Sequence, residues 1–277
     1  MPRLPLVLRL AAAAVCLPLG ATVALAQATP LDTLGILAAL RAEMDATRTP
    51  GVALAVVVGD RVAWATALGV ESVETGQPMT VASLVRVGSV TKLVTGVTAS
   101  LLAHEGALDF RAPIGQRARG LAPAIAARSL HALLTHAAGM INEAAGNGSH
   151  DDTALGERVR RWGGAQLFAP VGDVYSYSSP GYWLAGYVLE QTAATPYADL
   201  VEQRVLRPLG MRRSTFRPLA AMTWPHAQDH RVLAESTVVL RPYPDDASTW
   251  PSGSLFSNVL ELSRLAAARI ASVVRTS

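Results

Sequence analysis

The sequence predicts a mixed α/β (α+β) fold. Half of its 277 residues are hydrophobic and 16% are charged, a composition typical of a globular chain with a sizeable core. Two runs rich in β-branched residues, 52–58 and 62–68, flank the dipeptide Gly59-Asp60, and this pattern indicates a β-hairpin. Several other segments repeat their apolar residues at the 3.6-residue spacing of an α-helix. Strands near the start and helices along most of the remaining chain together indicate the mixed class.

The first 26 residues have the organisation of a secretory signal peptide. Arg3 and Arg9 provide a basic start, residues 10–25 are mostly apolar, and Ala24-Leu25-Ala26 is a cleavage sequence of the A-x-A type. The apolar stretch is too short for a good membrane span. We therefore expect export to the periplasm or the extracellular space.

Cleavage would leave a single domain of residues 27–277. It would also remove Cys16, the only cysteine, so the mature protein would have neither a disulfide nor thiolate chemistry. The formal net charge of +3 would fall to +1, because the two leader arginines are lost. No run of like charges occurs, and nothing in the sequence indicates a nucleic-acid partner.

A helix is predicted over residues 31–46, with Asp32 or Thr33 as its cap and Pro50-Gly51 as its end. The hairpin follows directly. Both faces of the strand 52–58 are apolar, so we expect its sheet to be covered on both sides.

The most informative stretch is Arg86-Val87-Gly88-Ser89-Val90-Thr91-Lys92, at the start of a predicted helix that ends at Gly106. This helix is apolar nearly all round, as expected of one that runs through the middle of a domain. Lys92 is the only lysine, whereas the other 23 basic side chains are arginines. An ammonium can lose its proton when it is desolvated, but a guanidinium in a protein cannot.

Ser89 precedes Lys92 by three residues and would lie on the same helical face. The positive end of the helix dipole and burial would both favour the neutral amine that a base requires. The pair therefore predicts an acyl-transfer nucleophile with its base. The alternative, that Ser89 is an ordinary helix N-cap, stays open at this point.

A short helix is predicted after Ser129, and it closes on a turn at Gly139. His136 in this turn could be a catalytic base, but no aspartate or nucleophile stands near it in the sequence. We therefore interpret His136 as a structural histidine at a helix end. Further helices are expected near residues 157–162, 197–206 and 259–270.

Residues 170–186 form a tyrosine-rich turn that opens into an apolar helix. Such a turn can aim a phenol into a cleft, and a tyrosine near a lysine can carry the proton of a serine. The alternative is that these tyrosines only pack. His226 and His230 have an i, i+4 spacing that could suggest zinc. Because no helical pattern surrounds them and no third ligand is apparent, we expect no metal site there.

Several motifs, taken in their order along the chain, resemble those of the serine β-lactamase and penicillin-binding-protein superfamily. They are most similar to its class C-like β-lactamase-related branch. Residues 86–92 resemble the block R-x-G-S-x-T-K, residues 133–139 the turn L-L-T-H-x-S-G, and residues 177–179 the motif Y-x-N. Residues 208–211 and 252–257 continue the order of the family, which includes carboxypeptidases and esterases.

The resemblance implies an antiparallel sheet flanked by helices, an inserted all-helical subdomain and an active site between them. Ser89 would be acylated, Lys92 would activate it, and Tyr177 would pass the proton to the leaving group. Ser179 would bind the substrate, a β-lactam, a D-Ala peptide derived from peptidoglycan, or an ester. No metal or organic cofactor is implied.

Two departures from the family pattern change these expectations. Ser179 stands where the family usually has asparagine, and its single hydroxyl offers a weaker grip on an acylamide, which favours esters over β-lactams. Only 24 residues follow Gly253, and the third family motif, K-T-G or H-x-G on a late strand, is not found there.

We therefore expect a truncated domain that lacks the last sheet strands and one backbone donor of the oxyanion hole, a loss that typically costs about 10²–10³ in rate. The alternative to a working hydrolase is thus a catalytically impaired family member or a non-catalytic cell-wall-binding remnant.

Overall fold

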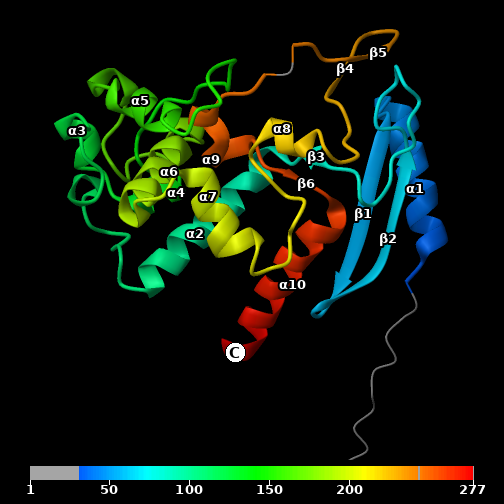
Figure 1. Ribbon diagram of the computed structural model, residues 1–277, viewed down its shortest axis with the longest axis horizontal. Helices are drawn as coiled ribbons and strands as arrows, with labels where there is room; N and C mark the ends of the chain where they lie inside the picture. Colours follow the sequence, from blue (N-terminus) through cyan, green and yellow to red (C-terminus); the bar gives the residue numbers. More distant parts are fainter. Residues whose placement is uncertain (1–30, 243, 277) are drawn as a thin grey trace, which may run out of the picture.

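The computed structural model describes residues 31–242 and 244–276 (Figure 1). The predicted signal peptide, residues 1–26, lies outside the described residues. Figure 1 shows a β-hairpin at one side of the molecule and most of the helices at the other. None of the helices in the described part of the chain is both long and apolar enough to cross a membrane.

The hairpin consists of β1 (Gly51–Val58) and β2 (Arg61–Gly69), which pair antiparallel as predicted. Helix α10 (Val259–Thr276) packs against both strands, and α1 (Thr33–Thr47) lies beside them (Figure 1). Asp32 caps α1 by accepting a 2.8 Å hydrogen bond from the N–H of Gly35. No residue of β1 is fully buried, so the expectation of a sheet covered on both faces is met only in part.

Two further antiparallel pairs are short. β3 (Val85–Arg86) pairs with β6 (Phe256–Ser257), and β4 (His230–Val232) pairs with β5 (Thr237–Val239). The described residues therefore form three separate two-stranded sheets together with the helices. The mixed α/β class is confirmed. The β3–β6 pair matters most, because it fixes the segment that leads into the serine of interest.

The helical part is built around α6 (Ser179–Ala193), in which residues 180–189 are all buried. This helix packs against α2 (Thr91–His104), α4 (Leu130–Leu134) and α9 (Trp250–Gly253). Trp183 and Leu184 are fully enclosed, and full burial of such side chains contributes about 1.5–3 kcal/mol each.

The remaining helices surround this core. The predicted helix at 157–162 begins a turn earlier than expected, and the one at 197–206 changes from α-helical to π-helical geometry halfway. These elements are α3 (Pro123–Ala126), α5 (Ala154–Arg160), α7 (Tyr197–Val201) with its π-helical continuation (Glu202–Leu206), and α8 (Pro218–Ala221).

Helix α2 differs from its prediction. Its buried face is partly polar, since the Oγ1 of Thr95 lies 2.7 Å from both the hydroxyl of Tyr197 and the carbonyl oxygen of Pro251. Its opposite face is open, and the side chain of Leu93 is 43% exposed. The expectation of an apolar helix that runs through the middle of the domain was therefore wrong, because Thr95 faces the core and Leu93 faces solvent.

Candidate active site

Ser89 lies in a single 3₁₀ turn, Gly88–Val90, immediately before α2. Gly88 has φ +54°, a left-handed conformation that favours glycine, so the chain can turn sharply into the helix. The N–H of Val87 donates a 2.9 Å hydrogen bond to the carbonyl of Leu255, which continues the β3–β6 pairing. The turn is thereby fixed from its N-terminal side, and Ser89 itself stays exposed.

Lys92 lies one helical turn beyond Ser89 and is only 8% exposed. Its Nζ donates a 2.8 Å hydrogen bond to the backbone carbonyl of Ser252. The same atom lies 3.3 Å from the Oγ of Ser89 and 3.5 Å from the Oγ of Ser179. The structure therefore brings Lys92 into contact with two of the residues predicted to share its site.

Tyr177 is the fourth predicted site residue, and it lies beside Ser89 and Lys92. Its hydroxyl lies 2.7 Å from the Oγ of Ser89, and the Nζ of Lys92 lies 4.8 Å from the centre of its ring. Burial acts to raise the pKa of Tyr177, but hydrogen bonding with Lys92 and Ser89 and the positive charge of Lys92 outweigh it and lower the pKa. All four predicted site residues are thus close together, although Tyr177 and Ser179 are far from Lys92 in the sequence.

Asn142 also lies at this site, and sequence reasoning did not identify it. Its Oδ1 accepts a 2.9 Å hydrogen bond from the N–H of Ser179, and its side chain is exposed. Ser178 caps α6 by accepting from the N–H of Gly181 and donates a 2.8 Å hydrogen bond to the carbonyl of Ile141. The turn between Tyr177 and α6 is therefore tied to the loop at residues 141–142.

His136 was interpreted as a structural histidine at the end of a helix. It does follow α4, with φ +59°, but its ring lies against Tyr177, with the ring centres 4.5 Å apart. Its Nδ1 accepts a 3.1 Å hydrogen bond from the N–H of Ser178, and its carbonyl accepts a 2.9 Å bond from the N–H of Ser176. Burial, and then the positive charge of Lys92, lower the pKa of His136. The packing of His136 against Tyr177 was not predicted from the sequence.

An open groove of about 310 Å³ runs along the exposed face of α2 from Lys92. Its position follows from helical spacing, because Leu93, Gly96 and Ser100 recur every three or four residues on the outward stripe of the helix. Apolar side chains dominate its walls, among them Leu93, Val97, Phe110, Leu134 and Tyr182.

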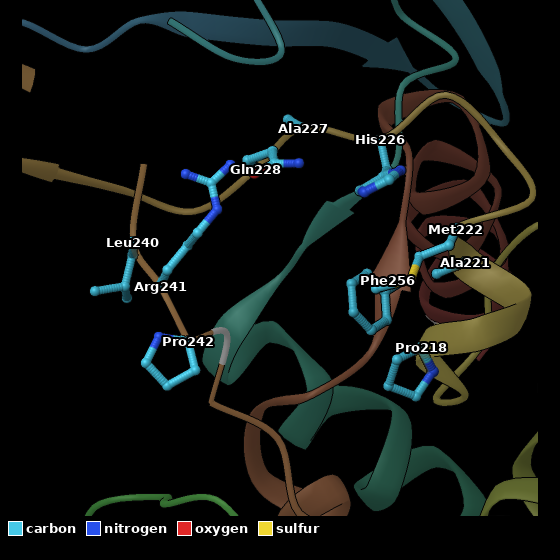
Figure 2. Close-up of a pocket in the computed structure, with 10 residues that line it drawn as sticks. All are labelled: Pro218, Ala221, Met222, His226, Ala227, Gln228, Leu240, Arg241, Pro242 and Phe256. Atoms are coloured by element: carbon cyan, nitrogen blue, oxygen red, sulfur yellow. The ribbon is translucent and has the colours of Figure 1, made fainter. Parts of the chain in front are cut away.

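A separate hollow of about 290 Å³ lies away from these residues (Figure 2). Figure 2 shows Leu240 and Pro242 on one side of it and Phe256 with Pro218 on the other. None of the four predicted site residues lines it. His226, one of the two histidines considered for zinc, does line it.

His226 and His230 face different partners. The Nδ1 of His226 lies 3.2 Å from the carbonyl of Trp224, whereas the Nε2 of His230 accepts a 3.2 Å hydrogen bond from the N–H of Val73. Among the residues that the structure describes, no group of three or more His, Cys, Asp or Glu side chains could hold a metal ion.

Known proteins share both the sequence pattern and the fold. The profile of the family described as Beta-lactamase matches residues 36–276. The chain is 30% identical to penicillin-binding protein 4 of Amycolatopsis lactamdurans over 74% of its own length and 54% of that protein. It is 32% identical to the esterase EstB of Burkholderia gladioli over 67% of its own length and 53% of that protein.

Among solved structures, an octameric penicillin-binding protein homologue from Pyrococcus abyssi superposes with a TM-score of 0.75 at 24% identity. The match covers 86% of this chain and 56% of that one, and it shows a shared fold. The chain thus spans about half the length of the curated relatives it matches. On the profile match over nearly all of the described residues, the chain belongs to the beta-lactamase family.

Proposed function

We propose that this chain is a secreted serine hydrolase that works through an acyl-enzyme on Ser89. The proposal rests mainly on one observation. The Oγ of Ser89 lies within hydrogen-bond distance of two groups that can carry a proton, 3.3 Å from the Nζ of Lys92 and 2.7 Å from the hydroxyl of Tyr177. A nucleophile hydrogen-bonded to its base, with the base oriented by a further group, is the arrangement that serine acyl transfer requires. Here the carbonyl of Ser252 orients Lys92.

In the first half of the reaction, the Oγ of Ser89 attacks the substrate carbonyl and its proton passes to Lys92. The tetrahedral intermediate then collapses, and Tyr177 delivers a proton to the leaving oxygen or nitrogen as the bond to the acyl carbon breaks. Its lowered pKa makes the phenol a better proton donor to the leaving group than an ordinary tyrosine.

In the second half, water attacks the acyl-enzyme, and Tyr177 accepts its proton. The tetrahedral intermediate then collapses: the bond between the Oγ of Ser89 and the acyl carbon breaks, Lys92 returns its proton to that Oγ, and the acid leaves. The backbone N–H of Ser89, at the N-terminal end of α2, is a natural donor to the oxygen that becomes negative in both halves. The scheme requires no metal or organic cofactor.

We place esters with an apolar acyl group first among the substrates. The hydroxyl of Ser179 offers one weak partner where an asparagine amide would hold an acylamide side chain. The apolar groove beside Lys92 can accept a hydrocarbon chain, and the esterase EstB is among the relatives of the chain. β-Lactams and D-Ala peptides from peptidoglycan are the other candidates, as for the penicillin-binding relatives. The predicted signal peptide would direct the enzyme to the periplasm or beyond, where such peptides occur.

Mass spectrometry of the intact protein tests the proposal directly. The chain is incubated with a penicillin and with the p-nitrophenyl ester of a medium-chain acid, and then quenched in acid. We expect an acyl adduct on the wild type that is missing in Ser89→Ala. No adduct with either reagent, or an equal adduct on the variant, rejects the hydrolase. Binding to isolated cell walls without any adduct would instead support the non-catalytic remnant.

A further inference from the structure

We propose that His136 is the positioning residue of Tyr177 and that it holds the phenol against Ser89 only while its imidazole is neutral. The inference rests on the proposed role of Tyr177 in proton transfer. It concerns how the phenol is kept in place, since Tyr177 is 39% exposed and precedes α6 instead of lying inside it.

His136 binds the chain on both sides of Tyr177. Its backbone carbonyl accepts the N–H of Ser176 at 2.9 Å, and its ring Nδ1 accepts the N–H of Ser178 at 3.1 Å. Between these two bonds, the imidazole packs on the phenol ring at 4.5 Å with 32° between the planes. One residue therefore restrains the backbone before Tyr177, the backbone after it and the rotation of its ring.

The bond from Ser178 depends on the protonation state of His136. A backbone N–H can only donate, so the Nδ1 that accepts it must carry a lone pair and the proton of the neutral ring must sit on Nε2. Protonation would turn Nδ1 into a donor facing another donor. It would also place a positive charge beside Lys92. Burial, and then the charge of Lys92, already lower the pKa of His136.

The titratable groups around this ring are few. Besides Tyr177, the rings of Tyr175 and Tyr182 face it, with centres at 5.8 Å and 5.3 Å, and Lys92 is the charged group that acts on it. Within the described part of the chain, burial and the charge of Lys92 shift the pKa of this ring and no carboxylate does, so acidification acts on the contacts between His136 and the Tyr177 segment through the imidazole itself.

The backbone of His136 allows a matched pair of variants. Asparagine tolerates the left-handed conformation at φ +59° and carries an oxygen able to accept the N–H of Ser178, so His136→Asn keeps the bond and removes the titration. His136→Phe keeps an aromatic ring against Tyr177 and removes the acceptor. Thermal unfolding of both variants identifies any general loss of structure.

Kinetics of the purified chain on the p-nitrophenyl ester, measured from pH 4 to 9, give the first readout. We expect His136→Phe to lower kcat by at least about tenfold with little change in KM, because the hydroxyl of Tyr177 is displaced while the substrate site is kept. We expect His136→Asn to retain more of kcat and to lose the part of the acidic limb that the imidazole causes, so that its profile at low pH differs from that of the wild type. A folded Phe variant with wild-type kcat, or an Asn variant with the wild-type acidic limb, overturns the proposal.

NMR of chain labelled at the Cζ of its tyrosines gives a second readout that needs no turnover, with Tyr177→Phe identifying the signal. We expect the Tyr177 signal to shift in step with protonation of His136 in the wild type and to lose that step in His136→Asn. If the chemical shift of Tyr177 does not follow the protonation of His136, the positioning role of His136 is rejected, even if the chain has no hydrolase activity. If only the acylation of Ser89 fails, the proposed hydrolase is rejected, but the NMR evidence that His136 positions Tyr177 still holds.

Discussion

The Nζ of Lys92 donates a 2.8 Å hydrogen bond to the backbone carbonyl of Ser252. That carbonyl is itself well fixed, because the Oγ of Ser252 accepts from the indole N–H of Trp183 at 2.7 Å and donates to the carbonyl of Thr249 at 3.1 Å. An amine tied in this way has its position set by the protein core and not by the substrate. The lysine is thus held ready beside Ser89 before any ligand arrives.

Lys92→Arg should therefore abolish turnover. A guanidinium cannot accept the proton of Ser89, and its planar fork cannot replace the single Nζ on the Ser252 carbonyl. We expect a fall in kcat on the p-nitrophenyl ester of at least about 10²-fold, the usual contribution of a positioned base. Circular dichroism should show a folded variant. Substantial activity in it would remove Lys92 from the mechanism and make its status as the single lysine a coincidence.

Ser179→Asn should shift the preference towards β-lactams. The amide would bring two donors and a carbonyl to the position where Lys92 now meets only a hydroxyl at 3.5 Å. We expect the rate of acylation by a penicillin to rise relative to acylation by the ester, measured as two adduct time courses on the same preparation. Ser179→Ala is the control, and it should lower both. An unchanged ratio in the Asn variant would mean that this position does not select the substrate.

Gly96 tests whether the groove along α2 binds the acyl chain. An added Cβ there would meet no atom within 4 Å, so a side chain can leave the backbone at this position without a clash. Gly96→Leu should fill the groove and lower kcat/KM for a long-chain ester relative to an acetate ester, since the groove follows α2 from Lys92 to Ser100, about 12 Å at 1.5 Å per residue.

Gly96→Ala is the matched control for that experiment. It removes the mid-helix glycine and should stabilise the protein by about 0.5–1 kcal/mol without filling the groove. A chain-length preference that stays the same in the Leu variant would place the acyl group elsewhere.

Glu190 should make the stability of the protein depend on pH. Burial, and secondarily the charge of Asp152, raise its pKa from 4.5 to about 7, although the N–H of Tyr197 donates to it at 3.2 Å. The folded chain therefore binds this proton more tightly than the unfolded chain, so stability from this group is complete below pH 4.5 and is lost as the pH rises through 7.

Because Glu190 is only partly shielded from water, we expect this loss to amount to about 1–2 kcal/mol. Glu190→Gln should remove it, so urea unfolding at pH 4.5 and pH 8 should show a smaller difference in the variant than in the wild type. Parallel changes in the two proteins would mean that other groups dominate.

Local patterns predicted most of the fold correctly. The Gly-Asp link predicted the hairpin, Asp32 and Thr33 were the two candidate caps of α1, of which Asp32 is the one observed, and the spacing of Ser89 and Lys92 predicted their contact within one turn. These are short-range relationships, and a few residues determine them. The positions of Tyr177 and Ser179 came from the resemblance to a family, because no local rule joins them to a helix that begins almost ninety residues earlier.

The features that were missed depend on long-range contacts. The Ser252 carbonyl that holds Lys92 is a backbone atom, which no residue pattern could identify. His136 looked isolated because its neighbours in space, Tyr177 and Ser178, are about forty residues away along the chain. The open face of α2 was missed because apolar spacing shows which residues could be buried, but not which of them a neighbouring element covers.

The single lysine also makes the protein its own conformational probe. Apart from the α-amino group, an amine-directed reagent has one target, and that target is 8% exposed at the bottom of the site. The rate at which Lys92 becomes modified would therefore measure how often this part of the molecule opens. Comparing that rate with the rate of global unfolding would show whether the site opens locally while the rest of the chain stays folded.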